Sequence, residues 1–576
     1  MENKNCNFEK SLILYFDANL LSKSDNLSKD FKVILEKFEN LTADIYSSHN
    51  FFNNFPENTF LFHIFNLIVD YNITKTNNLA SFLKATTNLI EDLLSKKQFT
   101  TEEIFISIIL LLHLYLKESI FGPSFFFLKE TEKVDLKDDI HLFDNSKFKS
   151  IHQKFSCEDI KNEIIDYLTI GGEIPYNHSK LTIFFVITHN ALMNTKLFDM
   201  FSILPLWKAR IGFLHNKLVK EPVNDLKELI FTNMELFKKE HKNKILSNEN
   251  EETRQKISSL LKIEESYYAL RFYRYKESEE LLESAREELK LKIELTGRLG
   301  RLTKYQEFDS AILVVDTKSS TLTNKVEVKT DDNLEFEDPN EVKKVLLDDL
   351  DKQNPLLEKP NFTDDKFLNS TELSVHDQLY VCGLLNLLRK SYPDEDLLRS
   401  IINAYISKSI EKSLDWLVYS RLLIFKSFNE DKRTKTVERS LVQIQSICEQ
   451  FNDRKPNTYA RFKFYFSTDY PYIWELKKQY AQMYMQFGAV LTAFEIFKEL
   501  EMNEECIQCL YVAGKNEAAL EFANTMLKKK EEPGIYCVLG EIQNNVEHFF
   551  KAIEISNGSY TRAYRCLGRF YFLLKE

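Results

Sequence analysis

The sequence contains unusually little glycine and proline. Of its 576 residues, 13 are Gly and 12 are Pro, whereas average usage of about 7% and about 5% would give about 40 and about 29. Sandwiches, barrels and Rossmann sheets need many turn residues, so this shortage favours long helices joined by short connections. We therefore predict an all-α protein.

Cysteines are also few, with eight in the whole chain. They are too sparse for a disulfide framework, so we expect a reducing compartment, the cytoplasm or the nucleus. Cys506 and Cys509 form a C-x-x-C pair, but no second pair follows at zinc spacing. Residues three apart share one face of a helix, and we interpret these two cysteines as core residues. We predict neither a metal nor a cofactor.

The chain lacks a long hydrophobic run. The most apolar stretch, Ile104–Leu116, has 13 residues, whereas a spanning helix needs about 20. The first residues, MENKNCNFEK, are charged and polar and lack the apolar core of a secretory signal. We interpret Ile104–Leu116 as a buried core helix and expect no membrane partner.

The charge balance is acidic. The sequence has 76 Lys and Arg against 87 Asp and Glu, which gives a net charge of −11. Nucleic acids and anionic membranes attract a basic field, so this balance argues against general binding to either. Hydrophobic residues make up 44% and aromatic residues 13%, enough for extensive buried cores rather than a disordered chain.

Motifs of common enzymes are missing as well. The sequence contains no Gly-x-Ser-x-Gly and no His-Glu-x-x-His. The stretch TGRLGRLTKYQ (296–306) offers Gly297, Gly300 and Lys304 as a phosphate-binding loop, but the spacing does not match a P-loop. We predict that the chain is not an enzyme and that it has no small-molecule substrate.

We interpret TGRLGRLTKYQ instead as the end of a helix. A stripe with spacings of three and four runs directly into it and consists of Leu282, Ala285, Leu289 and Ile293. Gly297 is then the helix stop, and Arg298 and Arg301 complement the negative end of the helix dipole. Together with Lys304, these two arginines are candidates for partner binding.

The pattern along the chain suggests four parts. We predict an α-helical N-terminal region over 1–250, a helical hairpin with the basic glycine turn over 251–316, an acidic flexible linker over 317–372, and a repeat solenoid over 373–576. The run Ala311–Val315 is β-like, but we expect it to be too isolated to form a sheet. In the first part, Trp207, Ile211, Leu214 and Leu218 form one helical stripe, and His215 beside it is interpreted as a packed histidine.

An internal repeat of helical hairpins is visible after residue 470. Two Leu-Gly pairs lie 28 residues apart, at Leu539-Gly540 and Leu567-Gly568. A single hairpin buries one side only, so such repeats must stack. The spacing is that of a compressed helical-hairpin repeat, and the pattern of large residues, Gly or Ala, and Tyr within each repeat indicates a tetratricopeptide-like superhelix. The predicted packing residues are Ala481, Gly488, Ala493, Phe497, Leu539, Gly540, Ala552, Leu567, Gly568 and Tyr571. The last hairpin has a first helix only, so we expect a solenoid truncated at the C-terminus.

Further candidate contact residues lie on the first repeat helix and in a basic stretch. Lys477, Gln482 and Tyr484 fall on the first helix. The stretch KRTKTVERS (432–440) supplies Arg433, Lys435 and Arg439 and is interpreted as a loop followed by a helix start with Thr436 as N-cap. An alternative is that this stretch and Arg298, Arg301 and Lys304 contact RNA.

Three stretches together resemble one family. They are TGRLGRLTKYQEFDSAILVV, LDWLVYSRLLIFKSFNEDKRTKTVERSLVQIQSICEQF, and the repeat region that begins IWELKKQYAQMYMQFGAVLTAFEIFKEL. In that order they resemble the tetratricopeptide repeat protein 27 family, whose fungal members are named for essential maintenance of the cell wall. The resemblance covers about residues 205–576.

The resemblance implies a non-catalytic adaptor. Proteins of this family are linked with co-chaperone assemblies that work beside the ninety-kilodalton heat-shock chaperone and the RuvB-like ATPases, with a spliceosomal ribonucleoprotein as a client. Repeat proteins that grip a chaperone's C-terminal carboxylate use a Lys and an Asn one helical turn apart. Here Gln482, and not Asn, lies one helical turn after Lys478. Val538 occupies a position where a later helix of such a clamp would supply a polar side chain. Both residues argue against a carboxylate clamp.

Overall fold

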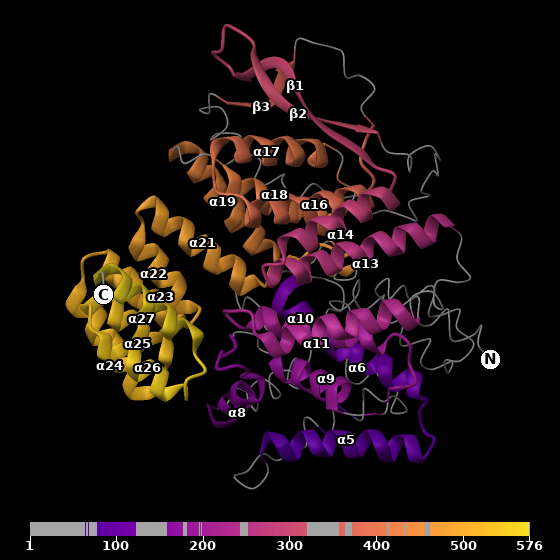
Figure 1. Cartoon of the computed structure of the whole chain (residues 1–576), viewed down its shortest axis with the longest axis vertical. Helices are drawn as coiled ribbons and strands as arrows, with labels where there is room; N and C mark the ends of the chain where they lie inside the picture. The colour runs from indigo at the N-terminus through magenta and orange to yellow at the C-terminus, as the bar shows by residue number, and fades with distance from the viewer. Residues whose placement is uncertain are drawn as a thin grey trace, which may run out of the picture. The chain divides into compact units, whose positions relative to one another are not determined.

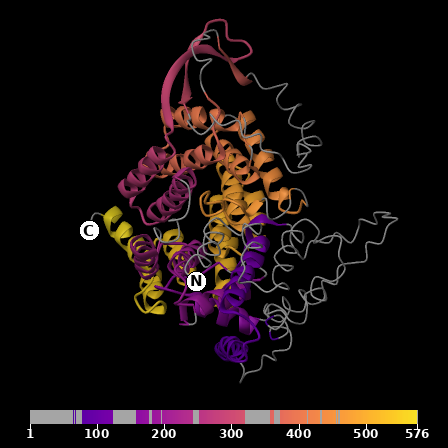
Figure 2. The ribbon, with the colours of Figure 1, turned by 90° about the vertical axis from the view of Figure 1, so that its right-hand side faces the viewer.

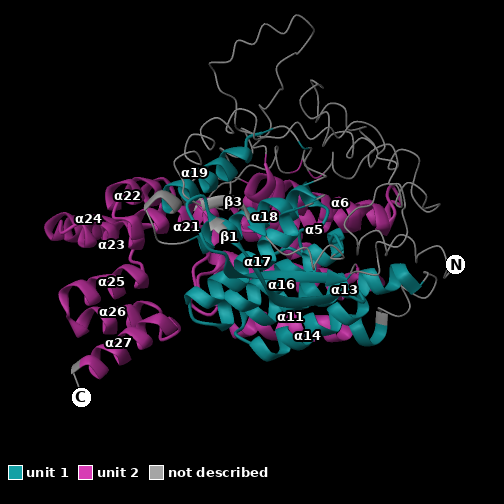
Figure 3. Ribbon diagram, turned by 90° about the horizontal axis from the view of Figure 1, so that it is seen from above, with its two compact units in different colours: residues 1–26, 35–45, 237–470 teal, residues 27–34, 46–236, 471–576 magenta. Residues whose placement is uncertain are grey.

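The computed structural model describes residues 64, 67, 78–122, 158–176, 181–194, 196, 198–241, 251–318, 356–362, 371–411, 413, 415–430, 434–453, 456 and 461–574. These residues belong to two compact units (Figure 3). Unit 1 contains those within 237–470, and unit 2 contains those within 46–236 and 471–576. The described chain is mainly α-helical, as predicted (Figure 1).

Unit 1 is built on packed helices. Their bounds are α13 Glu251–Arg271, α14 Tyr275–Glu288, α16 Val375–Ser391, α17 Asp396–Ile410, α18 Trp416–Asn429 and α19 Thr434–Gln450. The backbones of α14 and α16 approach closely at Gly383, where a Cβ atom would come within 2.7 Å of Leu282. Ser374 and Asp377 form a capping box that starts α16.

Unit 1 also contains a small antiparallel sheet with the strand order β2-β1-β3. Its strands are β1 Lys292–Thr303, β2 Ser310–Lys318 and β3 Leu356–Phe362. Figures 1 and 2 show the sheet beside α17, and α17 packs against β2. Pro360 lies in β3, an edge strand, where its missing N–H is tolerated.

The sheet corrects two of our interpretations. The β-like run at Ala311–Val315 is not isolated, because it lies in β2 and pairs with β1 from Lys292↔Lys318 to Gly300↔Ser310. Within the range predicted as a flexible linker, Leu356–Phe362 forms β3, and residues 319–355 and 363–370 lie outside the described residues. The four-part division of the chain stays a prediction.

The stop of α14 lies earlier than we predicted. Lys290 adopts the left-handed conformation with a φ of 52°, and the N–H of Leu291 donates to the Arg286 carbonyl at 3.2 Å. These features form a Schellman-type helix end. Gly297 is therefore not a helix stop, Ile293 is a strand residue, and Arg298 and Arg301 do not lie at the end of a helix.

The N-terminal helices of unit 2 surround an apolar core helix. Their bounds are α5 Leu79–Ser95, α6 Thr101–Leu116, α8 Glu158–Leu168, α9 Thr182–Asn194, α10 Leu204–Leu218 and α11 Asn224–Leu236. Thr100 and Glu103 form a capping box at the start of α6. Among the described residues, one helical stretch, Thr101–Phe121, has the length and composition to cross a membrane, and it is fully buried in the protein. Ile104–Leu116 is thus a core helix, as predicted.

The C-terminal part of unit 2 consists of helical hairpins. Its helices are α21 Ile473–Phe487, α22 Val490–Glu499, α23 Asn503–Val512, α24 Asn516–Lys529, α25 Pro533–Gln543, α26 Val546–Ile555 and α27 Thr561–Leu574. Helices α21, α23, α25 and α27 are the first helices of successive repeats, and consecutive hairpins pack on one another. Gly488 and Gly514 end two of these helices with φ angles of 92° and 73°, which a side chain disfavours.

Candidate protein-binding site

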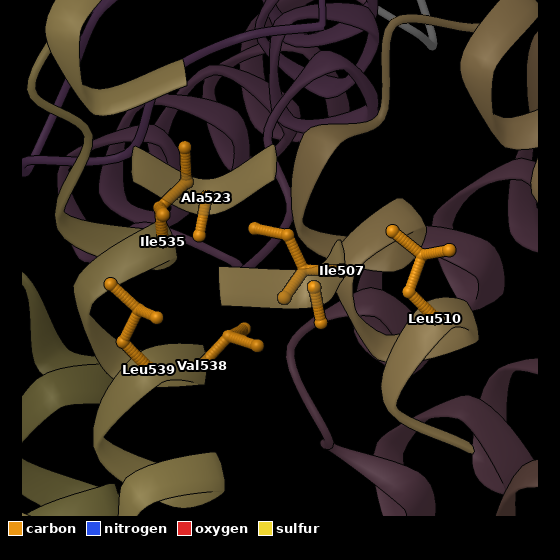
Figure 4. Close-up of a cluster of buried hydrophobic side chains, with 7 residues drawn as sticks. Ile507, Leu510, Ala523, Ile535, Val538 and Leu539 are labelled. Atoms are coloured by element: carbon orange, nitrogen blue, oxygen red, sulfur yellow. The ribbon is translucent and has the colours of Figure 1, made fainter. Parts of the chain in front are cut away.

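Small and apolar residues hold the hairpins together. Ala481, Ala493, Phe497 and Ala552 are completely buried, and Leu539 is nearly so. A further cluster joins α23, α24 and α25 (Figure 4). It consists of Ile507, Leu510, Ala519, Ala523, Ile535, Val538 and Leu539. Val538 is therefore part of the core, and it adds no polarity to the surface.

The two Leu-Gly pairs have different environments. A Cβ atom on Gly540 would meet the ring of Phe549 at 2.6 Å, so glycine allows α25 and α26 to approach closely. A Cβ atom on Gly568 would meet no atom within 4 Å. Leu567 is half-buried, and Tyr571 is 36% exposed. In the described residues, only the first pair forms a tight contact between helices.

The predicted contact residues of α21 lie partly at the surface. Gln482 is exposed, and Lys477 and Tyr484 are half-buried. The hydroxyl of Tyr484 lies 2.9 Å from that of Tyr480, and their rings meet edge to face. This arrangement holds two aromatic side chains in place beside polar neighbours, a composition common at protein interfaces.

An ion-pair network lies next to these residues on the first helices. Lys220, from the connection between α10 and α11, places its Nζ 2.7 Å from Glu504 Oε2 and 3.7 Å from Glu505 Oε1. Arg562 of α27 also pairs with Glu504. Lys478 of α21 lies 2.9 Å from Glu505.

The network shifts the pKa values of Glu504 and Lys220. Burial alone would raise the pKa of Glu504, but the charges of Lys220 and Arg562 outweigh it and lower that pKa. Burial would lower the pKa of Lys220, and the carboxylates of Glu504 and Glu505 raise it. Glu504 and Lys220 are therefore both charged at neutral pH.

This network was not predicted from the sequence. Lys220 and Glu504 are separated by 284 residues, and no local spacing relates them. Lys, Arg and Glu are also so frequent in the sequence that no single pair stands out. Gly534 is a sequence feature that relates to the network, because a Cβ atom there would overlap the Glu504 carboxylate.

The basic residues 298–304 lie in the hairpin of β1 and β2. The guanidinium of Arg298 stacks 4.3 Å above the ring of Phe362. Arg301 Nε donates to Asp309 Oδ1 at 2.9 Å. Lys304 is exposed in the turn. Arg298 and Arg301 are thus held by side chains of the protein itself, which weakens the case for a phosphate or RNA site.

The second basic stretch is only partly described. Arg433 lies outside the described residues, as does the side chain of Lys435 in α19. Arg439 pairs with Glu430. The helix α19 begins at Thr434, so Thr436 lies inside its first turn, and our interpretation of Thr436 as the N-cap is wrong.

The interpretations of Cys506, Cys509 and His215 as packed residues are confirmed. Cys506 and Cys509 are each 1% exposed in the core. His215 is buried, and its Nε2 lies 2.7 Å from the Leu168 carbonyl. In the part of the chain that the structure describes, no group of three or more His, Cys, Asp or Glu residues is placed to hold a metal ion.

Comparison with known proteins gives three informative relatives. A Dictyostelium discoideum protein described as a tetratricopeptide repeat protein 27 homolog is 29% identical over 443 residues, which are 73% of this chain and 51% of the relative. A TPR repeat-containing protein of Schizosaccharomyces pombe is 25% identical over 464 residues, 72% of this chain and 54% of the relative. Essential for maintenance of the cell wall protein 1 of Saccharomyces cerevisiae is 26% identical over 214 residues, 35% of this chain and 24% of the relative.

This chain spans about half the length of the first two of these relatives. No family model and no solved structure matches it. Tetratricopeptide repeat proteins generally bind other proteins, and their stacked hairpins supply extended surfaces for this. The relatives thus support a protein-interaction scaffold with a tetratricopeptide-like fold. The predicted resemblance of this chain to the tetratricopeptide repeat protein 27 family is confirmed.

Proposed function

We propose that this chain is a non-catalytic adaptor that binds other proteins along its helical hairpins. The observation that carries this proposal is the stack of hairpins from α21 to α27. Such stacks present side chains of successive helices at regular spacing, which suits recognition of extended or helical segments. Lys477, Gln482 and Tyr484 on α21 are the candidate contact residues.

We propose a finer role from the family resemblance. The chain acts as a co-chaperone-type factor in the assembly of large complexes, such as a spliceosomal small nuclear ribonucleoprotein. Its partners are then the heat-shock chaperone, the RuvB-like ATPases or spliceosomal client proteins, in the cytoplasm, the nucleus or both. Binding of the chaperone's C-terminal carboxylate through Lys478 is not part of this proposal, because Lys478 pairs with Glu505.

Affinity capture with quantitative mass spectrometry tests the proposal. The bait is the full chain, compared with a variant that carries Lys477→Glu and Gln482→Lys, and with a control variant, Lys528→Glu on the second helix α24. We expect a defined set of partners whose recovery falls at least fivefold with the α21 variant and stays unchanged with the control. If the wild-type chain captures no stable partner from gentle lysates, the proposal is wrong.

The alternative is an RNA-processing factor that touches RNA through Arg298, Arg301, Lys304 and the stretch at Arg433, Lys435 and Arg439. RNA binding through phosphates depends steeply on salt. Reversal of the charges at Arg301 and Lys304 would then abolish ultraviolet crosslinking to RNA. We expect no such loss, because the net charge is −11 and Arg301 already pairs with Asp309.

A further inference from the structure

Two loops of unit 2 lie against the first helices of the repeats. They are residues 169–176, between α8 and α9, and residues 219–223, between α10 and α11, and we refer to them as the docking loops. The N–H of Tyr176 donates to the carbonyl of Leu218, the last residue of α10, at 2.8 Å, so the first loop is held directly beside the start of the second. Val223 also lies against Gly171.

The docking loops match the charges of the helices that they contact. Lys220 pairs with Glu504 at 2.7 Å and approaches Glu505 at 3.7 Å, both on α23. The next residue, Glu221, pairs with Arg565 on α27 at 2.9 Å. A lysine and an acid that are adjacent in sequence thus meet opposite charges on two different repeats.

An aromatic contact and a close backbone approach complete the interface. The ring of Tyr176 lies 4.6 Å from that of Trp474 on α21, and its hydroxyl accepts from Lys478 at 3.1 Å. A Cβ atom on Gly172 would overlap the Ser559 hydroxyl just before α27. The loops therefore contact the first helices of the first, second and fourth repeats.

This interface is more polar than a domain core. Its charged side chains keep partial access to water, with Lys220 28% and Glu504 18% exposed, and Arg565 60% exposed, whereas Trp474 is buried. Polar, ion-paired interfaces that retain solvent are typical of reversible contacts, whereas permanent ones are mainly apolar. The face formed by α21, α23 and α27 is thus a charged surface that the docking loops cover.

We propose that the docking loops are an internal ligand that blocks this face and that a partner displaces them. The partner is a segment of another protein with a lysine for Glu504 and Glu505, an adjacent acid for Arg565, and an aromatic residue for Trp474. This inference rests on the proposed adaptor function and adds how its binding face is regulated. A tethered ligand acts at a high effective concentration, so a competing segment binds weakly until the tether contact is weakened.

Fluorescence anisotropy with a labelled peptide of residues 216–225 tests the proposal. The receptor is the full chain, either wild type or with Lys220→Ser and Glu221→Ser, which weaken the internal ligand and leave the face intact. We expect the peptide to bind the double variant at least tenfold more tightly than the wild type. Two controls should abolish this increase in peptide affinity. One adds Arg565→Ser to the double variant, and the other replaces Lys220 by serine in the peptide. Equal affinities for the folded double variant and the wild type would overturn the proposal.

Hydrogen exchange of the wild-type chain provides a measurement that needs no variant. If the loops open locally, amides of 169–176 and 219–223 exchange at least tenfold faster than those of Ile211–Leu214 in α10, under conditions where unit 2 stays folded. If both sets exchange at one common rate, the loops open only with global unfolding, and the proposal is wrong even where the double variant fails to fold.

The affinity capture described above separates the two proposals. If neither the wild-type chain nor the double variant captures a stable partner, the adaptor function fails regardless of the peptide result. If partners are captured but the peptide does not distinguish the two chains, only the internal ligand fails.

Discussion

Lys220 and Glu504 are separated by 284 residues in the sequence, and their side chains form an ion pair of 2.7 Å. The pair joins the connection after α10 to the second repeat. Because both partners are partly shielded from water, and Glu504 has a second cation in Arg562, the pair attaches the N-terminal helices of unit 2 to the repeats of the same unit.

Loss of Lys220 should destabilise unit 2. The variant Lys220→Met leaves Glu504 with Arg562 as its cation. We expect a loss of about 1–3 kcal/mol in the free energy of unfolding. This loss is smaller than that for a fully buried ion pair, because both side chains are partly exposed to water. The matched control is Lys161→Met, whose partner Glu501 is 67% exposed, with a loss below about 0.5 kcal/mol. Urea unfolding measures both. Equal losses in the two variants would contradict this interpretation of the network.

The two Leu-Gly pairs should respond differently to alanine. Gly540→Ala places a methyl group against the ring of Phe549, and overpacking of this kind costs about 1–3 kcal/mol. Gly568→Ala meets no neighbour within 4 Å and should gain about 0.5–1 kcal/mol from helix propensity. Thermal unfolding of both variants beside the wild type checks the sign of each change. If Gly540→Ala is as stable as the wild type, α25 and α26 are not as close as described.

The glycines of β1 provide a similar contrast. Gly297 has open space around it, so Gly297→Thr should be neutral or stabilising in a strand, by up to about 1 kcal/mol. A Cβ atom on Gly300 would lie 2.7 Å from the Asn361 carbonyl oxygen in β3, so Gly300→Ala should disturb the β1–β3 pairing. Proteolytic sensitivity of the segment 356–362 reports that pairing. Destabilisation by Gly297→Thr would instead favour the helix stop that we first predicted.

Unit 2 should lose stability in mild acid because of His113. Burial, and to a lesser extent the charge of Arg210, lowers the pKa of His113 to about 3, whereas an unfolded histidine titrates near 6.5. The stability from the neutral side chain is present above pH 6.5 and is lost as the pH falls toward 3. At pH 5 the expected loss in the free energy of unfolding is about 2 kcal/mol. The melting temperature of His113→Gln should therefore fall less between pH 7.5 and 5.0 than that of the wild type, and an identical fall would contradict this assignment.

The sequence predicted those features that depend on local chemistry. The hairpin periodicity and the turn at Gly488 were readable because a left-handed glycine after an amphipathic stripe is a local pattern. The family resemblance was readable for the same reason, because its motifs are contiguous. The core helix at Ile104–Leu116 followed from its length.

Long-range pairing explains what the sequence did not reveal. Gly297 looked like a helix stop because nothing nearby showed that β3, at Leu356–Phe362, would pair with the other edge of β1. Lys290 has no side-chain feature that marks it as the left-handed residue at the true helix end. The partners of Lys220 and Glu221 lie on helices α23 and α27, and only the folded chain brings them together.

Crosslinking mass spectrometry of the full chain with its captured partners tests the adaptor function most directly. Lysine-reactive crosslinks locate a bound protein along the sequence without any substitution in the chain. We expect crosslinks from partners to concentrate on Lys477 and other lysines of α21–α27. Crosslinks that map only to Lys292 and Lys304 of the β1–β2 hairpin, or none to the repeats, would contradict the account.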